Sequence, residues 1–366
     1  MHRSEPISRK PAGDVVPGSP GAPYRGRSAT DASGGAKRQR TKLWADAAQD
    51  APRIGILHNP RSHGNRKPGA DQIDTVTGRA DVESIAPASR DEIGQALLDF
   101  KRGGIDYLIV NGGDGTVRDM LTAGQRIFAD GWPLLAVMPR GKTNALTEDL
   151  GVPRDWTLEQ AVDAIGTAPG KRRRPLKIER LDGSMQPVAG FILGAGAFTT
   201  GIRTAQDAHR LGAFGGLAVG LTAVWGAAQM IFGTKRNRWR RGVEMKVALG
   251  QDRKPMPHSG HGEADRRSIL LATSLHKMPM DLKVFGAARE GLKIAAIDRP
   301  LRKVWLSMPA ILAGWEPEWL SESGFHRAEA NSFELTLGDE FILDGEVFPP
   351  GAYRVLLGPE LTFRTG

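Results

Sequence analysis

The sequence predicts two folded domains, a three-layer α/β domain followed by a β-sandwich. Three observations lead to this fold class. Short apolar runs alternate with helical spacing over residues 53–172. Many short β-branched and apolar runs, separated by turns, fill residues 173–366. Residues 1–52 are rich in Pro, Gly, Ser, Ala and Arg without apolar periodicity, which indicates a disordered basic tail.

The first domain is expected to hold a parallel sheet. Apolar runs predict its strands, at residues 54–57, 81–85, 106–110 and 134–138. Residues 91–100 have helical apolar spacing with acids at the start, so a helix is expected there. Alternating strands and helices give a parallel sheet with helices on both faces, whose ligands bind at the carboxyl ends of the strands. The loops after residues 57, 110 and 138 meet at that edge.

The second domain is expected to be mostly strands. Its candidate strands are residues 176–178, 188–193, 243–249, 268–272, 292–295, 304–306, 333–337 and 353–357. Many strands with few helices favour a β-sandwich. For the last segment of the chain, a return to the first domain is kept as an alternative.

Composition narrows the classes of function. The chain has 366 residues, a formal net charge of +9 and no cysteine. It therefore has no disulfide framework, thiolate zinc site or cysteine nucleophile, which fits a reducing compartment. The first residues lack an apolar stretch, so no secretory signal is expected. The positive charge favours an anionic partner such as a nucleotide phosphate, a nucleic acid or an acidic membrane.

One turn carries the clearest chemistry, the run of Gly112, Gly113, Asp114, Gly115 and Thr116 between a buried strand and a helix start. Glycines let backbone N–H groups approach an anion, and a helix N-terminus favours negative charge. Asp114 suits Mg²⁺, bound directly or through water, and Thr116 can cap the helix or touch phosphate. The alternative is a tight turn that needs glycine only for its geometry.

Residues 211–233 form an apolar segment without a charge, followed by the basic run of residues 235–241 with one tryptophan. Its six glycines and its place between strands argue against a membrane span. A core helix is one interpretation. The basic run that follows favours a helix at an anionic membrane surface, through residues 211–241, over a nucleic-acid contact.

Four motifs in order make the chain similar to the diacylglycerol kinase catalytic-domain family of lipid kinases, which includes bacterial diacylglycerol kinases, ceramide kinases and sphingosine kinases. The motifs are Asn59–Gly64, Gly112–Thr116, Pro139–Asn144 with Leu150-Gly151, and Asp344-Gly345-Glu346. The resemblance runs from about Arg53 to the end of the chain. It implies an N-terminal domain similar to NAD kinases and phosphofructokinases.

The resemblance also implies an activity, transfer of the γ-phosphate of ATP, with Mg²⁺, to the primary hydroxyl of a two-chain lipid. The product would be phosphatidic acid from diacylglycerol or ceramide 1-phosphate from ceramide. Phosphoryl transfer needs phosphate positioning, a metal and a group that accepts a proton. The residues that would bind the nucleotide are Asn59, Ser62, Gly112, Gly113, Asp114, Gly115, Thr116, Gly141, Lys142, Thr143 and Asn144. The resemblance implies that Asp344 and Glu346 supply the base, with Glu346 the first choice, and that Asp114 is catalytic as well. If the two residues lie on a strand, alternate side chains share one face, so both would face the cleft.

The sequence departs from the family pattern at four positions. Lys142 replaces a threonine, with Thr143 displaced by one, and Ala145 replaces an acid that often follows the asparagine. His63 replaces a glycine. Glu290 is the one carboxylate left at the counterpart of the family's magnesium loop, so we assign it, with Asp114, as a metal ligand.

Three other functions are weighed against the lipid kinase. An NAD kinase-like enzyme shares the glycine turn but not the other motifs. A non-catalytic membrane-binding module with a decayed kinase site is suggested by the departures at Lys142 and Ala145. A nucleic-acid binder rests on charge alone, and no nucleic acid is expected. For the lipid kinase we expect a cytoplasmic protein peripherally associated with the inner face of the membrane, with a homodimer left open.

Overall fold

The structure is a computed structural model that describes residues 51–66, 73–199, 242–288, 290–299 and 301–366, which belong to one unit of the chain. The expectations for the basic tail up to residue 50, for the apolar segment 211–233 and for the basic run 235–241 lie outside the described residues. No helix of the described part is long and apolar enough to cross a membrane.

The first sheet has six strands in the order β2-β1-β3-β4-β19-β5. They are β1 (Ile54–His58), β2 (Val82–Ile85), β3 (Tyr107–Asn111), β4 (Leu134–Val137), β5 (Gly170–Arg173) and β19 (Leu361–Arg364). Neighbouring strands from β2 to β19 run parallel, and β5 pairs with β19 antiparallel. Every residue of β1 and β3 is buried, as expected for a parallel sheet covered on both faces.

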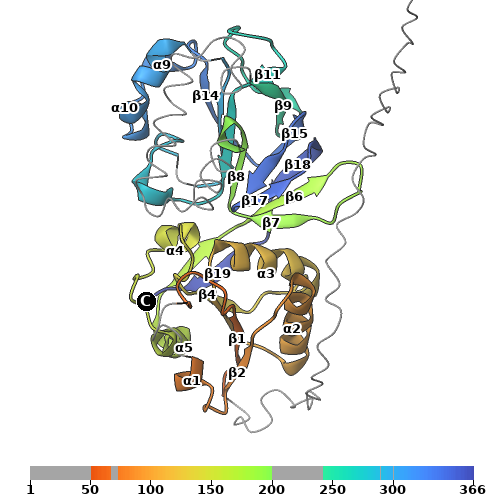
Figure 1. Cartoon of the computed structure of the whole chain (residues 1–366), viewed down its shortest axis with the longest axis vertical. Helices are drawn as coiled ribbons and strands as arrows, with labels where there is room; N and C mark the ends of the chain where they lie inside the picture. The colour runs from red at the N-terminus through yellow and green to blue at the C-terminus, as the bar shows by residue number, and fades with distance from the viewer. Residues whose placement is uncertain (1–50, 67–72, 200–241, 289, 300) are drawn as a thin grey trace, which may run out of the picture. The chain divides into compact units, whose positions relative to one another are not determined.

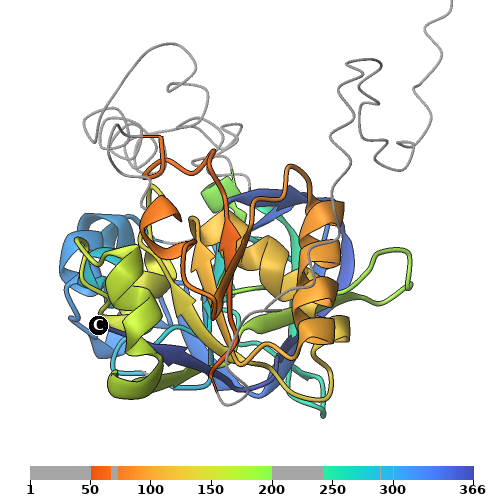
Figure 2. The same cartoon turned by 90° about the horizontal axis from the view of Figure 1, so that it is seen from below.

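Helices cover both faces of this sheet. They are α1 (Ile73–Val76), α2 (Arg90–Gly103), α3 (Asp114–Ile127), α4 (Ala145–Leu150) and α5 (Leu158–Thr167). Figures 1 and 2 show α2 and α3 on one face, with α1 and α5 on the other. Helix α2 begins where the Ser89 side chain accepts a hydrogen bond from Glu92 N–H, and ends at Gly104 in the left-handed conformation. The predicted α/β domain with a parallel sheet is confirmed.

Two antiparallel sheets make up the second part, with strand orders β10-β9-β15-β18-β6-β7, to which β11 adds beside β9, and β14-β13-β12-β8-β16-β17. Their strands are β6 (Leu176–Arg180), β7 (Val188–Gly190), β8 (Ile192–Gly196), β9 (Val243–Leu249), β10 (Lys254–Pro255), β11 (Arg266–Arg267), β12 (Ile269–Thr273), β13 (Leu292–Ile297), β14 (Phe325–Ala330), β15 (Ser332–Leu337), β16 (Phe341–Leu343), β17 (Glu346–Phe348) and β18 (Gly351–Leu357). Side chains from both sheets, such as Ile178 and Leu193, share one core. The predicted antiparallel β-rich region is thereby confirmed.

Short helices form a separate layer on this part: η1 (Pro279–Asp281), α9 (Arg302–Leu306), α10 (Met308–Leu312) and η2 (Glu318–Leu320). The prediction of a strand at residues 304–306 is wrong, because Val304 lies in α9. Val304 and Ile311 point into a small core of their own, together with Phe325. Their spacing of seven residues places both on one side of a helical segment.

Two side chains of the first sheet region, Thr122 and Asp149, contact the antiparallel part, and Asp149 also pairs with Arg173 of β5. The Thr122 hydroxyl of α3 accepts a hydrogen bond from Ala189 N–H of β7 at 3.0 Å. The fully buried Asp149 carboxylate of α4 pairs with Arg173 Nε at 2.5 Å and accepts Lys277 N–H at 2.6 Å. These contacts fix the segment around β7 and β8 against α3, which is what positions the site described next.

Candidate active site

The carboxyl edge of β1 and β3 is the point where the strand order reverses, since the chain passes from β1 outward to β2 and then back to β3. Such a point is where open α/β sheets bind ligands. The loops that leave this edge are tied together by backbone hydrogen bonds. Asn59 N–H donates to Asn111 O at 2.9 Å, and Gly64 N–H donates to Arg140 O at 2.8 Å. The three polar loops expected at this edge therefore meet there.

The glycines of the turn serve close packing. A Cβ on Gly112 would lie 2.6 Å from Cβ and Oγ1 of Thr116, and a Cβ on Gly113 would lie 2.6 Å from Cα of Gly141. The second contact presses the loop after β3 against the loop after β4. Gly115 differs, because the nearest atom to its Cβ would be an Arg118 nitrogen at 3.9 Å. The space beside Gly115, in the first turn of α3, remains open to a ligand.

Two asparagines fix the shape of these loops. Asn59 donates through Nδ2 to Thr116 Oγ1 at 2.8 Å, which links the loop after β1 to α3. Asn144 accepts Gly141 N–H on Oδ1 at 2.6 Å and adopts a left-handed backbone conformation with φ of 55°. Asparagine tolerates this conformation better than most residues, which explains its use before α4.

Asp114 opens α3, and its carboxylate faces the start of α4. Burial raises its pKa above the ordinary aspartate value, while hydrogen bonds from the backbone N–H groups of Ala145, Leu146 and Asn144 oppose the shift. The backbone thus holds this carboxylate at a fixed place beside the glycine turn. Gly113, which precedes it, carries no side-chain cap, so the end of the helix is left for another acceptor.

Asp344 and Gly345 form the two-residue turn of the hairpin between β16 and β17, with φ of 44° and 82°. Asp-Gly is a preferred pair for such a turn because both residues tolerate positive φ. The prediction that Asp344 and Glu346 share one face of a strand is wrong for this reason. The two side chains leave the turn separately, and they have different partners.

The Asp344 carboxylate packs against the end of β7 and the start of β8. Its oxygens accept Phe191 N–H and Ile192 N–H, each at 2.9 Å. A Cβ on Gly190 would lie 2.5 Å from Asp344 Oδ2, so only glycine leaves room for the carboxylate there. Because β7 rests on α3, this arrangement brings Asp344 into the field of Asp114.

The pKa of Asp344 is raised to about 7, mainly by burial of the carboxyl and further by the negative charge of Asp114, against hydrogen bonds from Phe191 and Ile192 and the positive charge of Arg118. Buried carboxyls whose pKa values are raised are typical of functional sites. The structure therefore brings together Asp114 and Asp344, which lie 230 positions apart in the sequence.

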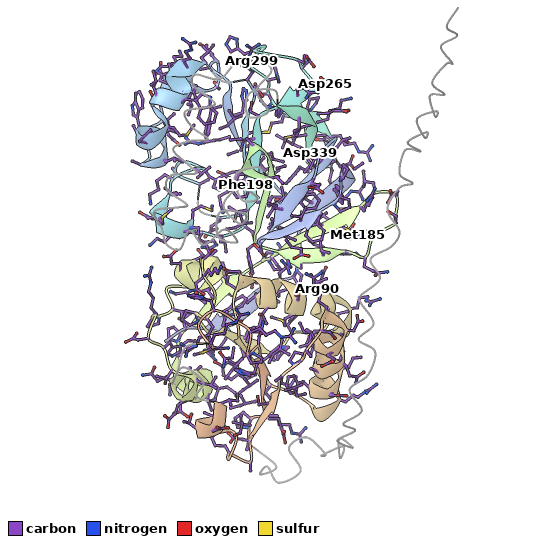
Figure 3. All side chains as sticks on the ribbon, in the orientation of Figure 1. Arg90, Met185, Phe198, Asp265, Arg299 and Asp339 are labelled. Carbon is purple, nitrogen blue, oxygen red and sulfur yellow. The ribbon has the colours of Figure 1, made fainter. Side chains whose placement is uncertain are left out.

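Glu346 belongs to a network of ion pairs beside this carboxylate pair. Its Oε1 lies 2.9 Å from Arg90 and its Oε2 lies 3.7 Å from Arg118. Asp119 completes the network, at 2.8 Å from Arg118 and 3.2 Å from Arg90. Arg90, labelled in Figure 3, begins α2, so α2, α3 and the hairpin turn all contribute to the network. Glu346 is thus held by cations, whereas Asp344 is held by backbone amides.

The remaining predicted residues are less closely engaged. Ser62 is buried in the loop after β1, while Lys142 and Thr143 are exposed in the loop after β4. Glu290 is exposed in the loop before β13. Within the described ranges no group of three or more His, Cys, Asp or Glu side chains could hold a metal ion.

Sequence reasoning missed Arg118 and Asn65. Arg118 lies one helical turn after Asp114, and that spacing in α3 was the available signal. Asn65 is buried, and its Nδ2 donates to Asn59 O at 2.9 Å and to Asn111 O at 3.2 Å. It bridges the loops after β1 and β3. No pattern in the sequence marked Asn65, because its partners come from two different loops.

Comparisons with known proteins agree with this geometry. Residues 53–175 match the family described as the diacylglycerol kinase catalytic domain. No curated protein matches the chain in sequence. The fold is similar to a crystal structure of a diacylglycerol kinase from Bacillus anthracis str. Sterne, with a TM-score of 0.58 and 16% identity over 87% of this chain and 99% of that chain. Two further structures from the same organism give TM-scores of 0.57, with 16% and 15% identity and the same coverage.

Residues 53–175, which include the glycine turn and the loops around it, match the diacylglycerol kinase catalytic domain, and this match identifies a kinase enzyme. The structural likeness, at its low identity, supports the fold.

Proposed function

We propose that this protein transfers the γ-phosphate of ATP to the primary hydroxyl of a two-chain lipid, diacylglycerol or ceramide, and releases phosphatidic acid or ceramide 1-phosphate. The observation that carries the proposal is the coupling of Asp114 and Asp344 beside the glycine turn, in a chain of a lipid kinase family. In this proposal residues 53–172 form a nucleotide-binding domain similar to NAD kinases and phosphofructokinases, and residues 173–366 bind the lipid.

The nucleotide phosphates are placed at the start of α3. Because Gly112 and Gly113 have no Cβ, the loop can pack closely against Thr116 and Gly141. The open space beside Gly115 lets phosphate oxygens reach the first backbone N–H groups of the helix. Asn59 holds Thr116 in place from the neighbouring loop. Exposed Lys142 adds a positive charge at the rim, where it can neutralise part of the phosphate charge.

We assign Asp344 as the general base that accepts the proton of the lipid hydroxyl. A general base works best when its pKa lies near the operating pH, and the pKa of Asp344 is about 7. Each carboxylate oxygen accepts one backbone N–H group and keeps a lone pair for a further partner. Glu346 is a weaker candidate because its two carboxylate oxygens are engaged by Arg90 and Arg118. We therefore reverse the order suggested by the family resemblance and assign Glu346 to positioning the hairpin turn.

The donor chemistry of the site suits a hard divalent cation. Mg²⁺ usually binds one or two carboxylates, with the remaining positions filled by water and substrate phosphates. Asp114 is an oxygen donor fixed beside the glycine turn. When bound there, Mg²⁺ would neutralise phosphate charge during transfer. Glu290, exposed in the loop before β13, is the other proposed ligand.

The proposal is tested with radiolabelled ATP and a panel of diacylglycerol, ceramide, sphingosine and monoacylglycerol in mixed detergent micelles. We expect one two-chain lipid to be labelled. Asp344→Asn should lower turnover by on the order of 100-fold or more, as expected when a general base is lost. Asp182→Asn, in an exposed turn, is the matched control and should keep the wild-type rate.

Glu346→Gln distinguishes the two carboxylates. We expect a smaller loss in this variant than in Asp344→Asn, on the order of tenfold, because it weakens the ion pairs that hold the turn. A larger loss in Glu346→Gln would return the role of base to Glu346. If the protein hydrolyses ATP but labels none of the four lipids, the lipid kinase assignment would be contradicted.

A further inference from the structure

The helical layer of the second part exposes large apolar side chains to solvent. Of the six exposed large hydrophobic residues in the described part of the chain, Leu301, Leu306 and Trp315 fall within fifteen consecutive positions. Leu306 is 69% exposed and Trp315 is 48% exposed. Single exposed leucines are ordinary, but a leucine pair and a tryptophan gathered on one short segment are not.

The exposed side chains follow the geometry of α9 and α10. Val304 and Ile311 face inward to the small core under these helices. Leu306 at the end of α9, Ala310 in α10 and Ala313 just after α10 are exposed. The segment thus packs apolar side chains inward and leaves others facing solvent.

Cations border this apolar face. Arg302 and Lys303 are exposed at the first turn of α9, and Arg299, labelled in Figure 3, is exposed shortly before it. Lys303 places its ammonium 4.3 Å from the centre of the Trp319 ring, so aromatic and basic groups are adjacent. Three acids also lie nearby. Glu316 is paired with Arg327, while Glu318 and Glu322 are exposed.

We propose that the surface formed by Leu301, Arg302, Lys303, Leu306, Ala310 and Trp315, called here the α9–α10 surface, docks on an anionic lipid bilayer. The partner is chosen by chemistry. Leucine and tryptophan insert at the boundary between headgroups and acyl chains, and cations beside them contact acidic headgroups. A second copy of the chain fits less well, because a symmetric contact would place the same cations opposite one another.

This inference rests on the proposed lipid kinase, whose substrate lies in a membrane, but it concerns a different part of the molecule. The α9–α10 surface is formed from α9 to Trp315, while the proposed catalytic groups lie on α3 and the β16–β17 turn. Docking through this surface would hold the enzyme on the membrane that contains its substrate. Loss of docking should therefore change activity on vesicles and spare activity on dispersed substrate.

The test is co-sedimentation of the full chain with vesicles of phosphatidylcholine, either alone or with about 30% phosphatidylglycerol. This share of phosphatidylglycerol gives the vesicles a strongly anionic surface. The double variant Leu306→Ser with Trp315→Ser should bind the anionic vesicles about tenfold more weakly, because two apolar anchors are lost. Leu181→Ser is the matched control, since Leu181 is 43% exposed on a different element and should bind like the wild type.

A second variant keeps the apolar face and removes charge. Arg299→Gln with Arg302→Gln should weaken binding to the anionic vesicles by about 25-fold and leave binding to phosphatidylcholine unchanged, since each cation near an acidic surface adds about fivefold to partitioning. Wild-type binding in both double variants, with wild-type unfolding temperatures, would overturn the proposal. A wild-type dimer without lipid that becomes a monomer in Leu306→Ser with Trp315→Ser would overturn it as well.

Activity separates this proposal from the catalytic one. Phosphorylation of acceptor in detergent micelles should be the same in the wild type and in both double variants, while phosphorylation of acceptor in anionic vesicles should fall with binding. If vesicle binding falls as expected and no lipid is phosphorylated by any protein, the docking surface stands and the proposed reaction fails. If micelle activity falls with vesicle binding, the surface belongs to the substrate site and the docking proposal fails.

Discussion

The titration of Asp344 gives the sharpest test of the proposed chemistry. Burial and the charge of Asp114 raise its pKa to about 7, and the base acts only when ionised. At pH 6 about one carboxyl in eleven is ionised, so kcat/KM should be roughly tenfold below its plateau there. By pH 8 about nine-tenths of the plateau should be reached. The assay is the rate of lipid phosphorylation in detergent micelles between pH 5.5 and 9.

The γ-phosphate of ATP also titrates in this range, so the protein contribution must come from a comparison of variants. Arg118 lowers the pKa of Asp344, and Arg118→Met should move the acid limb of the profile to higher pH. Arg118→Lys keeps the charge and should return the limb toward that of the wild type. Arg90→Met is the matched control, because Arg90 contacts the same Glu346 and Asp119 without being among the main causes of the Asp344 shift.

Coincident acid limbs in the wild type and in Arg118→Met would refute the reasoning, because they would show that the observed ionisation belongs to ATP or to another group. A profile that is flat from pH 6 to pH 8 would refute it more directly. Movement of the limb in Arg90→Met as large as in Arg118→Met would assign the ionisation to Glu346, which both arginines contact.

Two further predictions concern packing and buried charge. Gly113→Ala should separate two loops whose backbones already touch, so it should destabilise the fold by about 1–3 kcal/mol and weaken ATP binding. Gly115→Ala places its new Cβ 3.9 Å from the nearest atom, so this variant should fold like the wild type apart from helix propensity. Thermal unfolding measures the packing effect and calorimetric titration measures ATP binding, and equal losses of stability in the two variants would contradict the packing argument. Asp149→Ala should leave buried Arg173 without its carboxylate and lower the free energy of unfolding by about 3–5 kcal/mol. Asp163→Ala, which breaks an exposed ion pair with Arg79, is the control and should cost at most about 1 kcal/mol in denaturant unfolding. A similar cost in Asp149→Ala and Asp163→Ala would show that the Asp149–Arg173 pair is solvated.

The fold class followed from the sequence where local pattern decides structure. The apolar run before Gly112 has the length and composition of a buried parallel strand, and the acids and apolar spacing of residues 91–100 are those of a helix start. The prediction of a strand at residues 304–306 was wrong because three apolar residues fit a strand and a helix equally well. Only the position of Ile311, seven residues after Val304 and in the same small core, reveals the helical period.

The glycine turn and the loops at the carboxyl edge could be predicted because the parallel sheet fixes where they meet. Long-range contacts could not. Asp149 lies next to Arg173 and Lys277 only because α4, β5 and the loop after β12 converge, and nothing in the spacing of these residues records it. Asn65 joins two loops in the same way.

The choice between Asp344 and Glu346 shows how far a motif can carry an assignment. The sequence places two carboxylates two positions apart, and strand geometry would give them one environment. The Asp-Gly turn instead sends Asp344 to the backbone of Phe191 and Ile192, and leaves Glu346 to Arg90 and Arg118. One carboxylate is therefore made a stronger base by burial and a neighbouring negative charge, while the other keeps cations beside it. The two environments are set by residues more than 150 positions away, so the difference between the two carboxylates belongs to the fold and not to the motif.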